Sequence, residues 1–113
     1  MHELGLTKSL IDLVQKESEK QGFHKALEIC MILGEYSDVV PEYIIDLFPY
    51  ASKGTASEGA KLTFKHVPAR FLCRDCGYKG PVDRKEARCP TCGSTALKMT
   101  AGREFFVDSL KVE

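Results

Sequence analysis

Long apolar runs, low-complexity segments and a net charge are all missing from this chain of 113 residues. No apolar stretch approaches the roughly 18–20 residues that a membrane-spanning helix needs. The segment Met1–Gly5 also lacks the basic region and following apolar stretch of a secretory signal. These absences predict a cytoplasmic protein with no membrane segment. Because cytoplasmic thiols stay reduced, its paired cysteines are expected to bind metal rather than form disulfides.

The signatures of catalysis are missing too. The chain has no Gly-rich phosphate-binding loop, no local nucleophile motif and no metal site that keeps a position open for substrate. We therefore expect that the chain is not an enzyme. If nucleotide hydrolysis drives its function, another protein must supply that activity.

Charge is unevenly distributed although it sums to zero. Lys65–Arg103 holds nine Lys and Arg against three Asp and Glu, a balance of +6 that a zinc–tetrathiolate site would reduce to about +4. The plain interpretation is a solvated surface, and the sharper one is a basic module that docks an acidic partner. A nucleic-acid-binding zinc ribbon is the weaker alternative, because Phe71 and Tyr78 are too few aromatics for a stacking platform.

Hydrophobic periodicity predicts an α/β fold. Leu6, Leu10, Leu13 and Val14 recur at helical spacing, so we expect a helix over residues 3–21. The other expected elements are a strand at 25–33 with an apolar face of Leu27, Ile29, Met31 and Leu33, a helix from Pro41 that Pro49 kinks or ends, a strand at 60–67 and a last strand at 104–113.

This order predicts two helices on a small mixed three-stranded sheet, with a zinc-ribbon-like lobe inserted before the last strand. The expected domains are a metal-binding α/β domain of residues 1–68 and 103–113, and a four-cysteine lobe of residues 69–102. The fifth cysteine, Cys30, lies on the expected central strand, where a buried inert thiol is the default interpretation.

The strongest motif is a pair of C-x-x-C-G knuckles. They are Cys73-Arg74-Asp75-Cys76-Gly77 and Cys89-Pro90-Thr91-Cys92-Gly93. Each knuckle aims two sulfurs at one point, and the glycine after it permits a positive φ. Neither motif follows the strand-to-helix pattern of a redox site, so the spacing predicts a tetrahedral Zn²⁺ site with all four positions filled and hence a structural role.

The N-terminus offers a second donor set. The Met1 amine, the deprotonated amide of His2 and the imidazole of His2 would close a five- and a six-membered chelate ring, and three nitrogens in one plane suit Ni(II) or Cu(II). The Glu3 carboxylate, a water or a donor from elsewhere would fill the fourth position. A histidine in second place is more often an unremarkable residue near a chain end, so this pattern alone is weak.

Taken together, these motifs resemble the HypA family of hydrogenase nickel-incorporation proteins. The resemblance covers essentially the whole chain and includes Gly34-Glu35, Gly59-Ala60 and Gly102-Arg103-Glu104 beside the Met-His-Glu start and the knuckles. It implies an α/β nickel-binding domain, a zinc-ribbon-like domain, and nickel delivery to the large subunit of nickel–iron hydrogenase together with the GTPase HypB. In some bacteria the family also serves urease.

Carried over by position, the resemblance implies nickel ligation by His2, with the Met1 amine and Glu3 as further donors, and zinc ligation by the four knuckle cysteines. Some members add a nickel ligand from a histidine of the zinc lobe or from an Asp after the Gly-Glu turn. This chain has no histidine between Val67 and Gly102, and Asp38 lies only near that turn, so the fourth nickel ligand stays open. His24 and His66 are poor candidates for it.

Overall fold

The computed structural model describes residues 2–113, which form two compact units. The first unit contains residues 2–31, 39–65 and 106–113, and the second contains residues 32–38 and 66–105. The second unit therefore takes in the end of the first strand and the residues that follow it, as well as the cysteine-rich region. The expected domain limits at 69 and 102 stay a prediction.

The first helix, α1, spans His2–Gln21 and confirms the expected helix. It ends where Gly22 adopts a φ of 78° and donates its N–H to the Ser18 carbonyl at 2.8 Å. The buried stripe differs from the expected one: Leu13 is 46% exposed, whereas Thr7 is fully buried. Thr7 can lie there because its hydroxyl donates to the Glu3 carbonyl at 2.7 Å.

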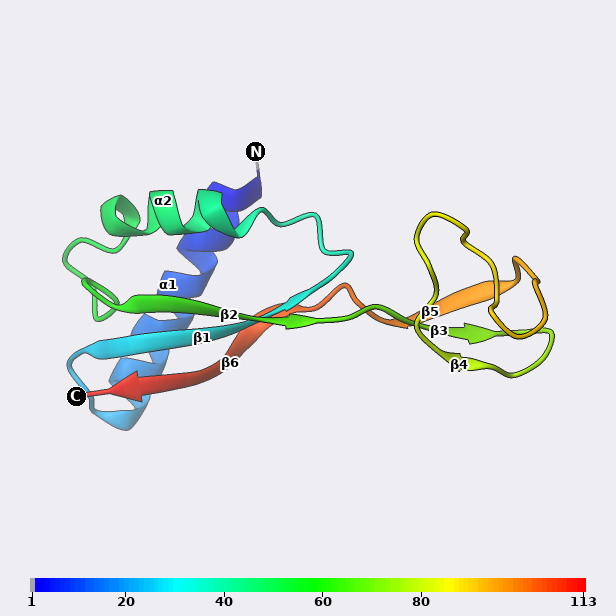
Figure 1. The fold of residues 1–113 in the computed structure, drawn as a ribbon. Helices are drawn as coiled ribbons and strands as arrows, with labels where there is room; N and C mark the ends of the chain where they lie inside the picture. The colour runs from blue at the N-terminus through cyan, green and yellow to red at the C-terminus, as the bar shows by residue number, and fades with distance from the viewer. Residues whose placement is uncertain (1) are drawn as a thin grey trace. The chain divides into compact units, whose positions relative to one another are not determined.

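The first unit is built around a mixed sheet with strand order β2-β1-β6, confirming the expected fold class. Strands β1 and β2 run in the same direction and β6 runs against them (Figure 1). The strands are β1 at Ala26–Gly34, β2 at Lys61–Val67 and β6 at Phe105–Val112. Helix α2, at Pro41–Ala51, connects β1 to β2.

The core of the first unit draws on both helices and on β1. Its large buried side chains are Leu10, Ile11 and Val14 of α1, Ile29 and Met31 of β1, and Ile44 and Phe48 of α2. No helix among the described residues has both the length and the apolar character to cross a bilayer.

Two local expectations need revision. Leu27 is 53% exposed, so on its face of β1 burial begins only at Ile29. Pro49 does not end α2, which continues to Ala51. Because Pro49 falls in the last turn, its missing N–H removes little of the helix's hydrogen bonding.

The second unit contains an antiparallel sheet with strand order β4-β3-β5. These strands are β3 at Arg70–Cys73, β4 at Lys79–Gly80 and β5 at Leu97–Ala101. The first cysteine of the first knuckle is the last residue of β3, so the sheet fixes where that knuckle starts.

Three chain segments are joined at one end of the second unit in what we call the glycine clasp, formed by Gly34–Tyr36, Val67–Ala69 and Gly102–Glu104. Gly34 donates its N–H to the Glu104 carbonyl at 2.7 Å, and Tyr36 donates to the Gly102 carbonyl at 2.7 Å. The Glu35 carboxylate accepts the Ala69 N–H at 2.8 Å. A side chain at Gly34 would collide with this arrangement, since a Cβ there would lie 2.2 Å from the Gly102 carbonyl oxygen.

Candidate metal centres

The first knuckle is a tight turn closed by two backbone hydrogen bonds. Gly77 donates its N–H to the Cys73 carbonyl at 2.9 Å, and Cys73 donates to the Tyr78 carbonyl at 2.8 Å. Gly77 has a φ of 79°, which residues with a side chain rarely adopt. The glycine after the cysteine pair is therefore required by the turn, as the sequence predicts.

The second knuckle repeats this geometry. Gly93 donates its N–H to the Cys89 carbonyl at 2.9 Å, Cys89 donates to the Ser94 carbonyl at 2.8 Å, and φ of Gly93 is 75°. The Thr91 N–H points at the Cys89 sulfur at 3.4 Å. A backbone N–H of this kind stabilises a thiolate, which is the form that binds metal.

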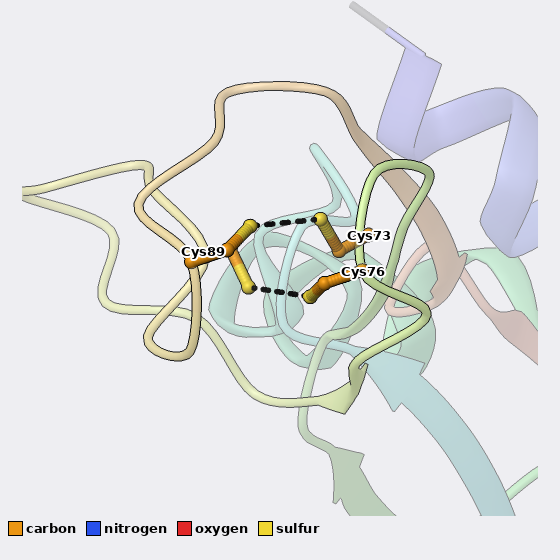
Figure 2. Close-up of side chains that lie close together, drawn as sticks. Cys73, Cys76 and Cys89 are labelled. Atoms are coloured by element: carbon orange, nitrogen blue, oxygen red, sulfur yellow. Dashed lines mark hydrogen bonds between the residues drawn. The ribbon is translucent and has the colours of Figure 1, made fainter.

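The two knuckles bring their four sulfur atoms into one cluster, all within 4.8 Å of one another. The Cys73 and Cys92 sulfurs are 3.6 Å apart, and those of Cys76 and Cys89 are 3.5 Å apart. Figure 2 shows the side chains of Cys73, Cys76 and Cys89 converging. A tetrahedron with Zn–S bonds of about 2.3 Å has edges of about 3.8 Å, so the donor set fits Zn²⁺. These separations are far too long for disulfide bonds of about 2.05 Å.

Because the four thiols lie close together, their pKa values move apart. The Tyr78 N–H lowers the pKa of Cys76, but burial and the neighbouring thiols outweigh it and raise that pKa to about 12. Burial raises the pKa of Cys89, yet the N–H groups of Cys92 and Thr91 and two neighbouring thiols lower it to about 6. One thiolate therefore forms readily and opposes ionisation of its neighbours, a conflict that a divalent cation would remove.

A side-chain contact also ties the knuckles together. Ser94, which follows the second knuckle, donates its hydroxyl to the carboxylate of Asp75 inside the first, and the same hydroxyl accepts the Ala96 N–H at 3.0 Å. Cys73 and Cys89 are buried, whereas Cys76 and Cys92 are exposed. Each knuckle thus contributes one inner and one outer sulfur.

The candidate nickel residues lie at the start of α1. Met1, whose amine the sequence predicts as a donor, lies outside the described residues. The His2 side chain is 54% exposed, and its Nε2 is 3.5 Å from Oε2 of Glu3. The Glu3 side chain is only 6% exposed, and its Oε2 also accepts the Val40 N–H at 3.4 Å.

The cysteines form the only cluster of three or more potential metal ligands within residues 2–113. His24 and His66 are exposed. Cys30, expected to be buried, is half-buried and free. The role of Val40 was missed by sequence reasoning because a backbone N–H contributes to the contact, and no residue type signals that.

Comparison with known proteins shows which family the chain resembles. Residues 1–112 match the sequence model of the family described as "Hydrogenase/urease nickel incorporation, metallochaperone, hypA". The chain is 35% identical to hydrogenase maturation factor HypA of Dehalococcoides mccartyi, covering all of this chain and 95% of the relative. It is also 35% identical to the HypA factor of Acidithiobacillus ferrooxidans, with both chains fully covered. The chain belongs to the HypA family.

The fold agrees with that assignment. The solution structure of the Ni metallochaperone HypA from Helicobacter pylori superposes with a TM-score of 0.73 at 24% identity, covering 99% of this chain and 97% of that one. Membership of the HypA family confirms the resemblance drawn from the motifs. It makes the chain a member of a family of nickel-incorporation metallochaperones that act in hydrogenase maturation.

Proposed function

We propose that this HypA-family chain carries Ni(II) on its N-terminus and delivers it to the large subunit of nickel–iron hydrogenase. The observation that supports this most is the pairing of an exposed His2 imidazole with the buried Glu3 carboxylate at the first turn of α1. An accessible donor can take up and release cargo, whereas a buried neighbour holds it in place.

The proposed ligands are the Met1 amine, the His2 amide nitrogen and Nδ1 of His2. Because the first N–H groups of a helix have no partner within the helix, the His2 amide is free to lose its proton and bind metal. The positive end of the helix dipole favours that deprotonation. Three nitrogens in one plane suit Ni(II) and leave a position open to an acceptor.

Glu3 has two roles open to it. Its carboxylate is a further donor for the fourth position, as the family resemblance implies. The contact of this carboxylate with Nε2 of His2 supports a second role. A histidine that binds metal through Nδ1 keeps Nε2–H free for a carboxylate, which fixes the ring and raises its basicity. The Val40 N–H and the low exposure of Glu3 hold the carboxylate in place for this contact.

We propose Zn²⁺ as the occupant of the four-cysteine cluster, held by Cys73, Cys76, Cys89 and Cys92. Four thiolates would complete its coordination, so the ion would have no open position and would stabilise the fold rather than carry out chemistry. Zinc would thus keep the second unit folded without competing for the cargo site.

Delivery of nickel would require partner proteins whose roles this chain does not fill. We propose that the GTPase HypB supplies nucleotide hydrolysis and that the chain itself is not an enzyme, because its sequence has no phosphate-binding loop. Urease is the second client that the family description favours. A cytoplasmic location fits both clients.

Titration of tag-free, zinc-loaded protein with Ni(II) tests the proposal. One added N-terminal residue displaces the amine from the chelate, and His2→Ala removes the imidazole. Each should lower Ni(II) affinity by at least about tenfold, the order of a lost metal ligand contact. His24→Ala, which changes another exposed histidine, is the matched control and should bind like the parent.

Zinc content should stay the same in all three variants. The proposal fails if the extended protein or His2→Ala binds Ni(II) as tightly as the parent. It also fails if His24→Ala weakens binding as much as His2→Ala does.

A further inference from the structure

The outer edge of strand β6 has no strand beside it. In the sheet order β2-β1-β6 this strand is an outer one, so within residues 2–113 no other strand pairs with the backbone groups along its outer edge (Figure 1). β6 is eight residues long, more than the roughly five to six residues of a typical strand. A long open edge offers a row of N–H and C=O groups to which another chain can add a strand.

A groove lies beside this edge, between β6 and the C-terminal half of α1. Its volume is about 480 Å³, within the range of roughly 300–1,000 Å³ that binding pockets have. All of its lining residues belong to the first unit. They are residues 106–110 and Val112 of β6, with Leu13, Glu17 and Gln21 of α1 and Phe23 just after it. We call this feature the β6 groove.

The β6 groove gathers apolar side chains that the fold leaves in water. Leu13, Phe106 and Val112 are exposed, and they make up three of the nine exposed large apolar residues within residues 2–113. Phe23 and Leu110 are half-buried and line the same groove. Single exposed apolar residues are common, but a cluster of them in a groove marks an interaction site.

The charged side chains that line the β6 groove are both acidic. They are Glu17 and Asp108, and no Lys or Arg is among the described residues that line it. Glu17 accepts a hydrogen bond from the Gln21 amide at 2.6 Å. Asp108 lies 3.9 Å from Nζ of Lys65, whose side chain is largely exposed. An exposed pair at this distance contributes little, so both carboxylates are available to a cation from another molecule.

Each wall of the groove combines apolar side chains with one carboxylate. Phe106, Asp108 and Leu110 alternate along β6 and therefore project from the same face of the strand. Leu13 and Glu17 are four residues apart in α1 and therefore lie on one stripe of the helix. An occupant of the groove would meet both kinds of side chain on both of its sides.

We propose that the β6 groove docks an extended segment of a partner protein that carries both basic and apolar residues. The segment would add a fourth strand to the sheet through backbone hydrogen bonds with the outer edge of β6. Its apolar side chains would contact Leu13 and Phe106, and its basic side chains would pair with Glu17 and Asp108. This inference goes beyond nickel carriage and does not depend on where nickel binds.

The lining charges favour such a partner over a second copy of this chain. Two copies that paired through β6 would present the same surface to one another. The Glu17 and Asp108 carboxylates of both copies would then face a shared groove that no cation lines. Like charges brought together across a strand pair are destabilising.

Fluorescence anisotropy of a labelled octapeptide, added to the zinc-loaded full-length chain, tests this proposal. The probe repeats Val-Val-Lys-Lys, which places valine and lysine alternately on both faces of an extended strand. It should bind at about 50 mM NaCl and more weakly at about 500 mM, where screening reduces the charge attraction but leaves the apolar contacts. The matched peptide that repeats Val-Val-Glu-Glu should not bind.

Paired variants test the apolar contacts. Leu13→Ser/Phe106→Ser removes two apolar side chains of the groove that are 46% and 51% exposed. It should weaken binding of the lysine peptide about tenfold or more, because two partly buried apolar contacts are lost. Tyr43→Ser/Ile45→Ser is the matched control, since these side chains of α2 are 50% and 47% exposed and lie outside the groove. It should bind like the parent.

A second pair of variants tests the charges. Glu17→Gln/Asp108→Asn should weaken binding about two- to tenfold, the range expected for two exposed ion pairs, and should reduce its dependence on salt. Glu42→Gln/Asp46→Asn makes the same change in net charge on α2, outside the groove, and should bind like the parent. Ni(II) titration of all these variants should match the parent, so a failure here leaves the nickel proposal untouched.

Hydrogen exchange followed by NMR tests strand addition directly. Only every second N–H of a strand points to a given edge, so the lysine peptide should slow exchange at alternate amides of β6. Binding that leaves the exchange of every β6 amide unchanged would overturn the proposed strand pairing.

The docking proposal is overturned if the lysine peptide does not bind at low salt or if the glutamate peptide binds as tightly. Equal losses in a groove variant and its α2 control would also overturn it, because the effect would then not belong to the groove. A parent dimer that Leu13→Ser/Phe106→Ser converts to a monomer, measured by analytical ultracentrifugation, would assign the groove to a second copy instead.

Discussion

Replacing Gly34 by alanine should disrupt the glycine clasp, and the structure sets the scale of the effect. An added Cβ would lie 2.2 Å from the Gly102 carbonyl oxygen and 2.7 Å from the Arg103 nitrogen. Both neighbours are backbone atoms that cannot rotate away. The two segments must therefore separate by about 1 Å to reach ordinary van der Waals contact.

That separation costs packing and hydrogen bonds. Forcing an extra methyl group into a packed site costs about 1–3 kcal/mol. The hydrogen bonds from Gly34 to Glu104 and from Tyr36 to Gly102, both 2.7 Å long, would weaken or break at about 0.5–1.5 kcal/mol each. We expect Gly34→Ala to lower the free energy of unfolding by about 2–6 kcal/mol, a large share of the roughly 5–15 kcal/mol of a typical domain.

Urea denaturation of the zinc-loaded protein, followed by circular dichroism, measures this change. Gly5→Ala is the matched control, because Gly5 lies in α1 with nothing within 4 Å of its Cβ position. Alanine is favoured over glycine inside a helix, so that variant should gain about 0.5–1 kcal/mol. A Gly34→Ala protein that unfolds within about 0.5 kcal/mol of the parent would refute the close approach on which this reasoning depends.

Three further results are expected. Zn²⁺ added to metal-free protein at pH 7.5 should release about three protons rather than four, measured with a pH indicator, because Cys89, with a pKa of about 6, is already ionised while Cys76, at about 12, is not. For the same reason zinc affinity should fall as pH is lowered. Cys73→Ser should lower bound zinc, measured by a chromogenic chelator, and leave Ni(II) binding per folded chain unchanged. Glu3→Ala should destabilise the protein to urea by about 0.5–1.5 kcal/mol, the net contribution of one hydrogen bond, because it removes the acceptor of the Val40 N–H; an unchanged free energy of unfolding would count against that contact.

Periodicity was enough to locate the helices and strands of the first unit. The α1 helix and strands β1, β2 and β6 begin within about one residue of their expected positions, within the usual uncertainty of such boundaries. The cysteine cluster was also predictable, because C-x-x-C-G constrains the turn locally: the positive φ at Gly77 and Gly93 depends on those few residues and on nothing distant.

The buried face of α1 was not predictable from apolar spacing alone. Thr7 and Ser18 are buried although they are polar. Each hydroxyl donates to a backbone carbonyl of the same part of the chain, Thr7 to Glu3 and Ser18 to Phe23. A satisfied hydroxyl loses most of the cost of burial, so a ranking by hydrophobicity places the stripe about one position away from where it lies.

Contacts made by backbone groups could not be predicted from the sequence either, for a different reason. Glu3 is held by the backbone N–H of Val40, and Tyr36 donates to the backbone carbonyl of Gly102. Every residue type has such a carbonyl, and every type except proline has such an N–H. Only the fold decides which N–H meets which acceptor. The carboxylates of Glu35 and Glu104 likewise accept the backbone N–H groups of Ala69 and Gly102, partners that the sequence does not name.

The second unit shows why a chain of this size would need a metal. Among its described residues the buried apolar side chains larger than alanine are Ile32 and Leu33, apart from the cysteines Cys73 and Cys89. A segment of fewer than about 50 residues with so small a core cannot offset its conformational entropy by hydrophobic burial. Its interior is instead occupied by the cysteine sulfur atoms and by the backbone of the glycine clasp, which leaves no room for a side chain. The cysteine cluster therefore takes the place of a hydrophobic core.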